Sequence, residues 1–218
     1  MNDFATQRTN MVDSQVRPSD VTDRRIVRAM LAVPREAFVP EQVKATAYMD
    51  EHLALRQEGR YMLAPRTFAK LVQLLVIGED DAVLDVACAT GYSTAVLSPL
   101  ARAVVGVEEN AALAQRAREI LADLGRQNTT VRTGALTAGS PAEGPFDAIL
   151  INGCVADVPD VLLDQLKDGG RLAAVRADGR LGQATLWRRH GTSFDARPAF
   201  DANAPLLPGF GKNPGFVF

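Results

Sequence analysis

The pattern of hydrophobic and polar positions divides the chain into three zones. Residues 1–80 carry apolar positions three or four apart, which is typical of helices with one buried face. Residues 81–175 carry short apolar runs of strand length that alternate with helix-length amphipathic stretches. Residues 176–218 alternate apolar and polar positions and then become rich in proline and glycine. We therefore expect helices, then alternating strands and helices, then an antiparallel hairpin and a loop that folds back.

Two helices are predicted in the first zone. Ser19 or Asp20 is placed to cap a helix whose apolar positions share one face, namely Ile26, Val27, Met30 and Leu31. Pro34 ends this helix and leaves an extended stretch over residues 35–40. Pro65 suits the first turn of a second helix, which continues through residue 76.

The second zone predicts a parallel sheet. Its strands are expected at residues 82–86, 103–107, 130–133, 146–151 and 171–175. Helices are expected after Gly91, over residues 111–124 with Gly125 closing the helix, and through residues 161–166. Strands separated by helices indicate an α/β fold with a doubly wound, mostly parallel sheet. The fold class is thus Rossmann-like, with an N-terminal helical extension and a C-terminal antiparallel hairpin.

Length and composition fit one compact domain. We expect N-terminal helices and a capping loop over residues 1–80 and a ligand-binding core over residues 81–218. With 47% hydrophobic and 23% charged residues the chain resembles soluble globular proteins, and its formal net charge of −2 predicts neither nucleic acid nor membrane as a partner. The first residues lack the basic and apolar regions of a signal peptide, so none is expected, and no apolar run comes near the roughly 20 residues of a membrane span. Two cysteines make no disulfide framework, so a cytoplasmic location is expected.

The segment VLDVACATGYST, residues 83–94, carries the candidate chemistry. Asp85 lies in the first strand of the sheet, a loop of small residues follows it, and Glu108 ends the second strand. Ligands in open α/β sheets bind beyond the carboxyl ends of the strands, and an acid about 20 residues further on accepts hydrogen bonds from ribose hydroxyls. The sequence therefore predicts a ligand with a ribose, held by Asp85, this loop and Glu108.

The spacing of small residues separates two cofactor classes. A dinucleotide fingerprint that starts at residue 87 needs glycine at residue 92, where Tyr92 stands, so NAD is disfavoured. The spacing 87, 89, 91 resembles the first motif of class I methyltransferases that use S-adenosylmethionine (AdoMet), although Ala87 and Ala89 replace two glycines. Each alanine costs about 1 kcal/mol if its φ is positive, and only crowding if it is negative. The sequence leaves that choice open.

Longer segments resemble one family. Residues 11–40, MVDSQVRPSDVTDRRIVRAMLAVPREAFVP, are similar to the N-terminal segment of protein-L-isoaspartate O-methyltransferases. Similar matches follow in AYMDEHLAL, VLDVACATGYSTAVLSPL, PFDAILINGC and LLDQLKDGGRLAAV, so that the resemblance covers roughly residues 11–190. It implies an AdoMet-dependent O-methyltransferase that releases S-adenosylhomocysteine. Its substrates would be isoaspartyl-containing peptides or proteins, whose carboxylates are methylated in protein repair.

The resemblance assigns roles to matching positions. The residues around AdoMet would be Asp85, Ala87, Cys88, Ala89, Gly91, Glu108, Ala135 and Leu136, and the substrate pocket would contain Tyr61, Met62 and Leu63. Where the family reads like G-Q-T-I-S-x-P this chain reads GRYMLAP, so Tyr61 and Leu63 replace two hydroxyl residues. Where the family has G-D-G after the third strand, this chain has GAL, residues 134–136. Tyr61 is the one candidate catalytic donor.

These departures leave three functions open. The first is isoaspartyl methyl transfer, and the second is a descendant that binds a cofactor or a partner without catalysis. The third is a methyltransferase for a different acceptor, bound against the apolar stretch Tyr61–Leu63.

Other polar residues have ordinary explanations. Cys88 and Cys154 are expected to be small buried side chains, because nothing near them in sequence lowers a thiol pKa. His52 and His190 lack the spacing of metal ligands, so no metal site is expected. We expect solvated loop side chains, or alternatively a site for an acidic substrate group, at Arg56, Arg60 and Arg66.

Overall fold

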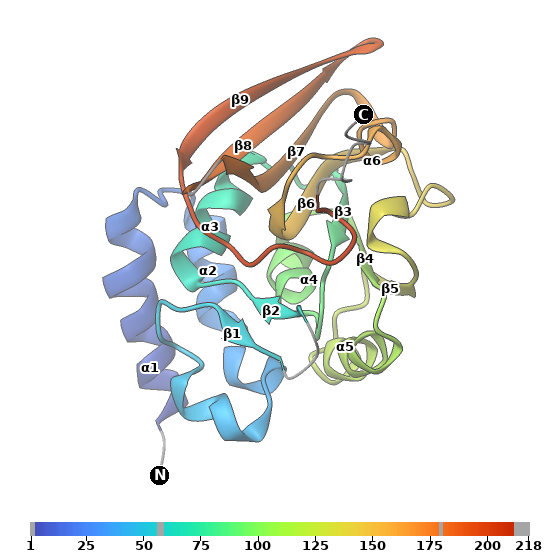
Figure 1. Cartoon of the computed structure of the whole chain (residues 1–218). Coiled ribbons are helices and arrows are strands. Elements are labelled where there is room, and N and C mark those ends of the chain that lie inside the picture. The colour runs from blue at the N-terminus through green and yellow to red at the C-terminus, as the bar shows by residue number, and fades with distance from the viewer. Residues whose placement is uncertain (1–2, 56–58, 179–180, 212–218) are drawn as a thin grey trace, which may run out of the picture.

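A computed structural model describes residues 3–55, 59–178 and 181–211 of the chain. At its centre is a seven-stranded sheet in the order β5-β4-β3-β6-β7-β8-β9 (Figure 1). The strands are β3 (Ala82–Val86), β4 (Ala103–Glu108), β5 (Thr129–Thr133), β6 (Phe146–Val155), β7 (Leu166–Asp178), β8 (Leu181–His190) and β9 (Ser193–Asp201). Strands β3 to β7 pair in parallel, and β7, β8 and β9 pair antiparallel. The predicted fold class is confirmed.

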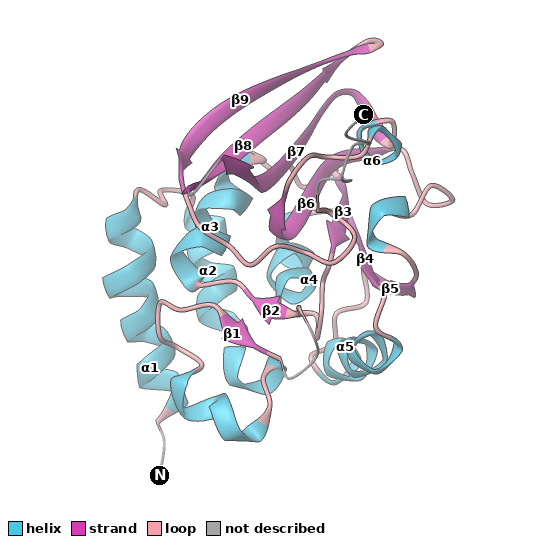
Figure 2. Ribbon diagram, in the orientation of Figure 1, coloured by secondary structure: helices cyan, strands magenta, loops and turns pink. Residues whose placement is uncertain are grey.

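Helices and short turns surround this sheet (Figure 2). The α-helices are α1 (Phe4–Met11), α2 (Arg24–Ala32), α3 (Pro65–Leu74), α4 (Tyr92–Leu97), α5 (Ala111–Asp123) and α6 (Asp160–Leu163). A π-helical turn lies at Val12–Val16, and 3-10 turns lie at Arg17–Ser19, Arg35–Phe38, Glu41–Thr46, Ser98–Leu100 and Leu136–Ala138. A separate two-stranded ribbon pairs β1 (Leu53–Ala54) with β2 (Tyr61–Met62).

Both faces of the sheet are covered, which explains why the central strands are apolar throughout. Successive side chains of a strand point to opposite faces. Val83 of β3 accordingly belongs to a core shared with α2, α3, α4 and α5, whereas Leu84 belongs to a second core beside α6. Leu207 and Phe210, from the segment after β9, complete the second core. The carboxyl ends of the strands are thus held between two packed layers.

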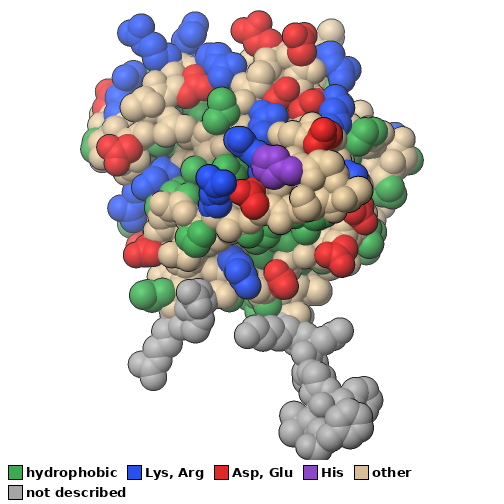
Figure 3. All heavy atoms as spheres, turned by 90° about the horizontal axis from the view of Figure 1, so that it is seen from above, with side chains coloured by type: hydrophobic (Ala, Val, Ile, Leu, Met, Phe, Trp, Pro, Cys, Tyr) green, Lys and Arg blue, Asp and Glu red, His purple; other side chains and the backbone are tan. Residues whose placement is uncertain are grey.

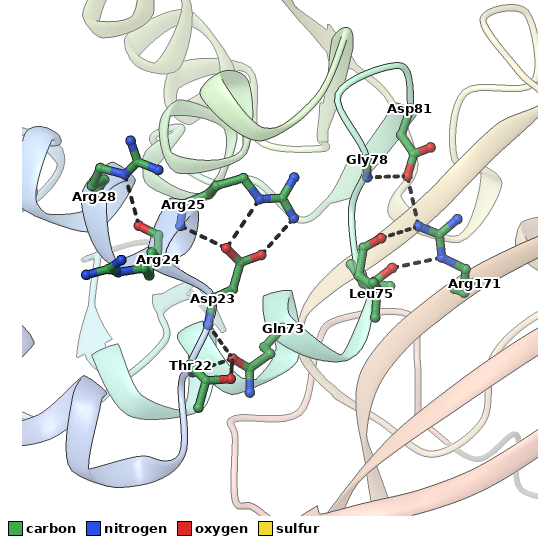
Figure 4. A network of polar contacts seen from close by, with 11 residues as sticks. Thr22, Asp23, Arg24, Arg25, Arg28, Gln73, Leu75, Gly78, Asp81 and Arg171 are labelled. Atoms are coloured by element: carbon green, nitrogen blue, oxygen red, sulfur yellow. Dashed lines mark hydrogen bonds and ion pairs between the residues drawn. The ribbon is translucent and has the colours of Figure 1, made fainter.

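Polar side chains fix the helical layer to the sheet (Figure 4). The Oε1 atom of Gln73 in α3 accepts hydrogen bonds from the backbone N–H groups of Thr22 (2.7 Å) and Asp23 (3.1 Å), just before α2. Arg171 of β7 pairs with Asp81, before β3, at 2.8 Å. The start of α2 and the end of α3 are therefore held at defined positions beside the sheet.

The cap of α2 differs from the prediction. Asp23, rather than Ser19 or Asp20, accepts the hydrogen bond of a helix N-cap, from the backbone N–H of Arg25 at 2.8 Å. Asp20 instead has a φ of 62° at the end of a 3-10 turn. The chain changes direction at this left-handed residue, between the first helical segment and α2, so the predicted cap was three or four residues early.

Three further boundaries were wrong. Residues 35–38 form a 3-10 turn rather than an extended stretch, because the buried Arg35 side chain holds them against the core. Strands β6 and β7 are longer than predicted, since glycines interrupt the apolar runs by which they were recognised. Helix α6 is only one turn long, and Gln165 beyond it accepts a hydrogen bond from the Ser140 backbone N–H at 2.8 Å.

The C-terminal part follows the prediction as far as residue 211, where the described part of the chain ends. Strands β8 and β9 form a long antiparallel ribbon, and the next segment returns across the sheet (Figure 1). There the Cys154 backbone N–H donates to Pro205 O at 2.8 Å, and the Leu207 N–H donates to Cys154 O at 2.9 Å. A Cβ on Gly153 would lie 2.5 Å from Leu207 Cγ, so this glycine makes room for the returning segment.

Charges of both signs are mixed on the face that carries the end of this ribbon (Figure 3). Among the residues that the structure describes, no helix combines the length and the apolar character needed to cross a membrane.

Candidate functional site

Strands β3 and β4 bring the two predicted acids to one edge of the sheet. They pair in parallel with Asp85 opposite Gly106, so that Glu108 ends β4 beside the loop that follows β3. Both carboxylates are fully buried. The backbone N–H of Cys88 donates to Val107 O at 3.1 Å, which fixes the loop to the neighbouring strand. The structure therefore places the acids and the loop together.

The structure gives the sign of φ at the two alanines of the loop, which the sequence left open. Ala87 has a φ of 62°, Ala89 a φ of 52° and Gly91 a φ of 92°. All three lie in the left-handed region, where alanine costs about 1 kcal/mol relative to glycine. The loop thus keeps the conformation of a glycine-rich loop while carrying two methyl groups, both of which are buried.

Asp85 is surrounded by donors. Its Oδ2 accepts hydrogen bonds from the hydroxyls of Ser93 (2.7 Å) and Thr94 (2.6 Å), at the start of α4. Its Oδ1 accepts from the Asn152 side-chain amide at 2.6 Å. Burial raises the pKa of Asp85 to about 6, although these three donors each oppose the rise. Both oxygens are therefore engaged within the protein.

Glu108 is likewise engaged. Its Oε2 accepts from Arg60 Nη2 (2.6 Å) and from the Ala89 backbone N–H (2.9 Å). Its Oε1 accepts from Arg60 Nε (3.2 Å) and from the Asn110 N–H (3.0 Å). A carboxylate offers about four lone-pair positions, so these four donors use all of them.

Arg60 contradicts the expectation of a solvated loop side chain. Its side chain is 2% exposed and forms a two-pronged ion pair with Glu108. Its remaining nitrogen, Nη1, is buried and has no hydrogen-bond partner within the described part of the chain. Arg66 does match that expectation, since it is 58% exposed and pairs with Asp50 at the surface, whereas Arg56 lies outside the described residues.

A small cavity of about 20 Å³ lies between the loop and the segment around β2. Six of the predicted site residues line it: Tyr61, Met62 and Leu63 on one side, and Ala87, Cys88 and Ala89 on the other. A cavity of about this size holds one water molecule and is far smaller than a nucleoside ligand. The types of residue suit AdoMet, but in this arrangement the site is closed and does not fit it.

Three predicted residues lie elsewhere around the edge. Gly91 begins α4 and packs against Ala117 of α5, whose Cβ would lie 3.1 Å from a Cβ on Gly91. Ala135 follows β5, is exposed, and offers no side-chain acceptor. Leu136 is buried in the second core and is not one of the residues that line the cavity.

Tyr92 has a packing role. Its ring lies 5.6 Å from that of Phe38 and 5.5 Å from that of Phe68, and the Arg35 guanidinium lies 4.7 Å from it. Arg35 is fully buried, and its Nη2 donates to Leu63 O at 2.6 Å. Burial lowers the pKa of Arg35 and raises that of Tyr92. This cluster fixes the backbone of residue 63 above the loop.

The cysteines match the expectation from sequence. Cys88 and Cys154 are free and buried, and burial raises the pKa of both thiols. His52 lies between two backbone groups: Nδ1 accepts from the Ala64 N–H at 3.1 Å, and Nε2 donates to Asn203 O at 2.8 Å. Within the described ranges, no three His, Cys, Asp or Glu side chains gather as metal ligands would.

Sequence reasoning missed three residues of this site and favoured the wrong setting for a fourth, Arg60. Asn152, Ser93 and Thr94 bind Asp85, and Arg60 binds Glu108. Asn152 was detectable, since it is the first polar residue after the apolar run at residues 148–151 of β6, the strand that neighbours β3. Ser93 and Thr94 stand at the start of the helix after the loop, where a hydroxyl can turn back. Nothing local in the sequence marks Arg60 as buried.

Comparison with known proteins identifies relatives along most of the chain. A family model described as protein-L-isoaspartate(D-aspartate) O-methyltransferase (PCMT) matches residues 6–191. A protein-L-isoaspartate O-methyltransferase of Roseiflexus sp. (strain RS-1) is 39% identical over 209 residues, which cover 95% of this chain and 94% of the relative. That of Methylorubrum extorquens (strain PA1) is 37% identical over 211 residues, covering 96% and 92%.

Solved structures share the fold. One protein-L-isoaspartate O-methyltransferase superposes with a TM-score of 0.82 at 24% identity, over 93% of this chain and 66% of that one. Another, from Plasmodium falciparum in complex with S-adenosyl-L-homocysteine, gives a TM-score of 0.78 at 20% identity over 95% and 99%.

Proposed function

The chain belongs to the protein-L-isoaspartate(D-aspartate) O-methyltransferase family, and we propose that it methylates isoaspartyl carboxylates in peptides or proteins. Membership makes it an AdoMet-dependent O-methyltransferase. The observation that carries the proposal is the extent of the match, because residues 6–191 include both strand-end acids and the segment that covers them. Cytoplasmic action is also part of the proposal, and the two free thiols are compatible with it.

The cofactor side of the site is proposed to be the sheet edge. Glu108 is the acceptor for the ribose hydroxyls, since an ionised carboxylate takes two hydrogen bonds from a diol. Asp85 and the backbone of residues 87–91 lie beside it, and Asn152 holds Asp85 in place. Ala135 and Leu136, after β5, would be the neighbours of the adenine. When bound, AdoMet supplies the electrophilic methyl group.

The acceptor side is proposed to be the segment around β2. Tyr61, Met62 and Leu63 line the cavity opposite the loop, and Tyr61 carries the one hydroxyl among them. A carboxylate needs no general base at neutral pH, so the rate of methyl transfer depends on orientation and desolvation. Residues 1–80 would thus act as the capping part and residues 81–218 as the cofactor-binding part.

Two alternative functions are favoured by one observation, the apolar character of the acceptor side. Leu63 is 3% exposed and occupies the position of a hydroxyl residue, so it cannot donate to a carboxylate. A methyltransferase for a less polar acceptor, or a binding protein without catalysis, would suit this pocket. Methyl transfer into cell-extract proteins separates these two, because only the former labels an extract component.

The decisive experiment is transfer of labelled methyl groups to two peptides that differ only in an isoaspartyl or an aspartyl residue. We expect labelling of the isoaspartyl peptide alone. Glu108→Gln should lower kcat/KM by about tenfold or more, because the neutral amide is a weaker acceptor for the diol. Glu109→Gln, an exposed neighbour, is the matched control. AdoMet binding without transfer to either peptide would overturn the isoaspartyl function and leave the two alternatives, a different acceptor or binding without catalysis.

A further inference from the structure

The two prongs of Arg60 occupy half of the acceptor positions of Glu108. Of the four donors to this carboxylate, two are the backbone N–H groups of Ala89 and Asn110. The other two are Nε and Nη2 of Arg60. A ribose diol also brings two donors, one to each oxygen. The guanidinium therefore occupies the two positions that the diol would need.

Of the four donors, only those of Arg60 can move away from Glu108 without disrupting the structure at the carboxyl ends of β3 and β4. The Ala89 N–H belongs to the loop whose Cys88 is bonded to β4, and Asn110 caps α5 through its own side chain. Arg60 instead precedes β2, a strand of two residues that pairs with the equally short β1. The Leu55 N–H also donates to Arg60 O at 3.0 Å, so among the described residues release of Arg60 breaks few backbone hydrogen bonds.

The segment that carries Arg60 also closes the cavity. We call residues 59–63 the lid segment. Its Tyr61, Met62 and Leu63 face the loop across a space of about 20 Å³. Withdrawal of Arg60 from Glu108 would move residues 61–62, which now line the cavity, while Arg35 holds the carbonyl of Leu63 in place at the end of the lid segment. The ion pair and the closure of the cavity are therefore coupled.

In the closed arrangement one buried donor of Arg60 is not satisfied. Arg60 Nη1 has no hydrogen-bond partner among the residues that the structure describes. Buried donors of charged groups are normally satisfied, and an exception calls for an explanation. A state in which the lid segment opens and hydrates Arg60 would satisfy its donor.

We propose that Arg60 is an internal competitor of AdoMet for Glu108, and that the lid segment must release Arg60 before the cofactor binds. The inference rests on the proposed function, specifically on Glu108 as the ribose acceptor. Cofactor affinity is then reduced by the fraction of molecules that are closed, since the apparent Kd equals the intrinsic Kd divided by the competent fraction. Arg60 thereby sets how much AdoMet the protein needs.

The test is calorimetric titration of AdoMet into the wild type, Arg60→Gln, Arg66→Gln and Glu108→Gln, with hydrogen exchange of the lid segment measured in each. Arg60→Gln should bind AdoMet about tenfold tighter or better, because the neutral side chain no longer competes for the carboxylate. Arg66→Gln removes a charge near the same segment but breaks only a surface pair, so its Kd should be unchanged. Both Arg60→Gln and Glu108→Gln should speed hydrogen exchange in the lid segment. Of these two variants, only Arg60→Gln should bind AdoMet more tightly than the wild type.

The outcomes distinguish failure of the competition from failure of the proposed function. If the wild type binds AdoMet and Arg60→Gln binds no tighter, the competition is overturned while the proposed function stands. If no protein binds AdoMet at millimolar concentration although lid exchange rises in Arg60→Gln, the proposed function is overturned and the competition with it. Should Arg60→Gln fail to fold, Arg60→Lys keeps the charge and loses the fork, and an intermediate gain in affinity is then expected.

Discussion

Cys88 fills the space that a side chain on Gly106 would occupy. A Cβ on Gly106 would lie 2.9 Å from Cys88 Sγ, and Thr94 Oγ1 would be 3.1 Å away. Gly106 lies in the middle of β4, directly opposite Asp85 of β3. The glycine in an otherwise apolar strand is therefore matched to the cysteine of the neighbouring loop.

Gly106→Ala should destabilise the protein by about 1–3 kcal/mol, because the added methyl group overpacks a closed site. Cys88→Ala should relieve part of this cost by removing the sulfur, so a double-mutant cycle should give a coupling of about 0.5 kcal/mol or more. Urea denaturation of the wild type, the two single variants and the double variant measures this coupling. Gly134→Ala, where a Cβ meets nothing within 4 Å, is the control. If Gly106→Ala costs the same free energy with cysteine as with alanine at position 88, Cys88 and Gly106 are not matched in size.

The alanines of the loop lead to a second prediction. Ala87→Gly and Ala89→Gly each relieve about 1 kcal/mol of left-handed strain and lose about 0.8 kcal/mol of buried methyl group. The two effects offset each other, so each variant should keep its free energy of unfolding within about 0.5 kcal/mol.

Ala95→Gly is the comparison, since Ala95 is also fully buried but lies within α4. It loses the methyl group and about 1 kcal/mol of helix propensity with no strain relieved, so about 2 kcal/mol should be lost in total. Denaturant unfolding of the three variants at one pH suffices. A loss at position 87 or 89 as large as that at 95 would mean that no strain was stored in the loop.

Asp85 makes stability depend on pH. Because burial raises the pKa of Asp85 to about 6, from 3.8 in the unfolded chain, the folded state binds more protons between these two values. Its contribution to stability is complete below the unfolded pKa and is lost as pH rises through about 6, on the order of 3 kcal/mol in all. The wild type should therefore lose stability relative to Asp85→Asn as pH rises from 4 to 7.

This comparison isolates one group, because Asp23 and Asp147, whose pKa values are lowered, are present in both proteins and act in the opposite direction. Urea denaturation at several pH values gives the difference curve. The Ser93 and Thr94 hydroxyls can accept from an asparagine as well as donate to it, so Asp85→Asn keeps the local packing. Parallel stability curves would show that Asp85 is not destabilised by burial.

The sequence was sufficient for features that depend on local pattern. The apolar runs of β3 and β4 and the convergence of Asp85 with Glu108 follow from strand length and from parallel pairing. Features that depend on distant partners were not accessible. Arg60 is buried only because the fold brings Glu108 to it from 48 residues further on, and the helical turn at Arg35 depends on carbonyls at Ala47 and Leu63.

The φ values of Ala87 and Ala89 could be predicted only in part. The spacing to Gly91 indicated a loop of the glycine-rich type, yet alanine identity argued against positive φ. Tertiary context decided, because the Cys88 N–H is bonded to Val107 and the Ala89 N–H to Glu108. Two fixed hydrogen bonds outweigh about 1 kcal/mol of strain per residue.

The last prediction concerns the missing hydroxyls of the lid segment. Arg35 holds the carbonyl of Leu63 at 2.6 Å, so the backbone there is fixed and a serine would present its hydroxyl to the loop. Tyr61→Thr combined with Leu63→Ser should raise isoaspartyl methyl transfer by about tenfold, because a positioned donor orients the carboxylate. It should also cost about 2–4 kcal/mol of stability through the lost burial of Leu63.

Transfer to the isoaspartyl peptide at saturating AdoMet measures the gain, and Val76→Ser, on an exposed side chain, controls for an added hydroxyl. A folded double variant with wild-type rates would mean that orientation at residues 61 and 63 does not limit this enzyme, and that the apolar lid serves a different acceptor.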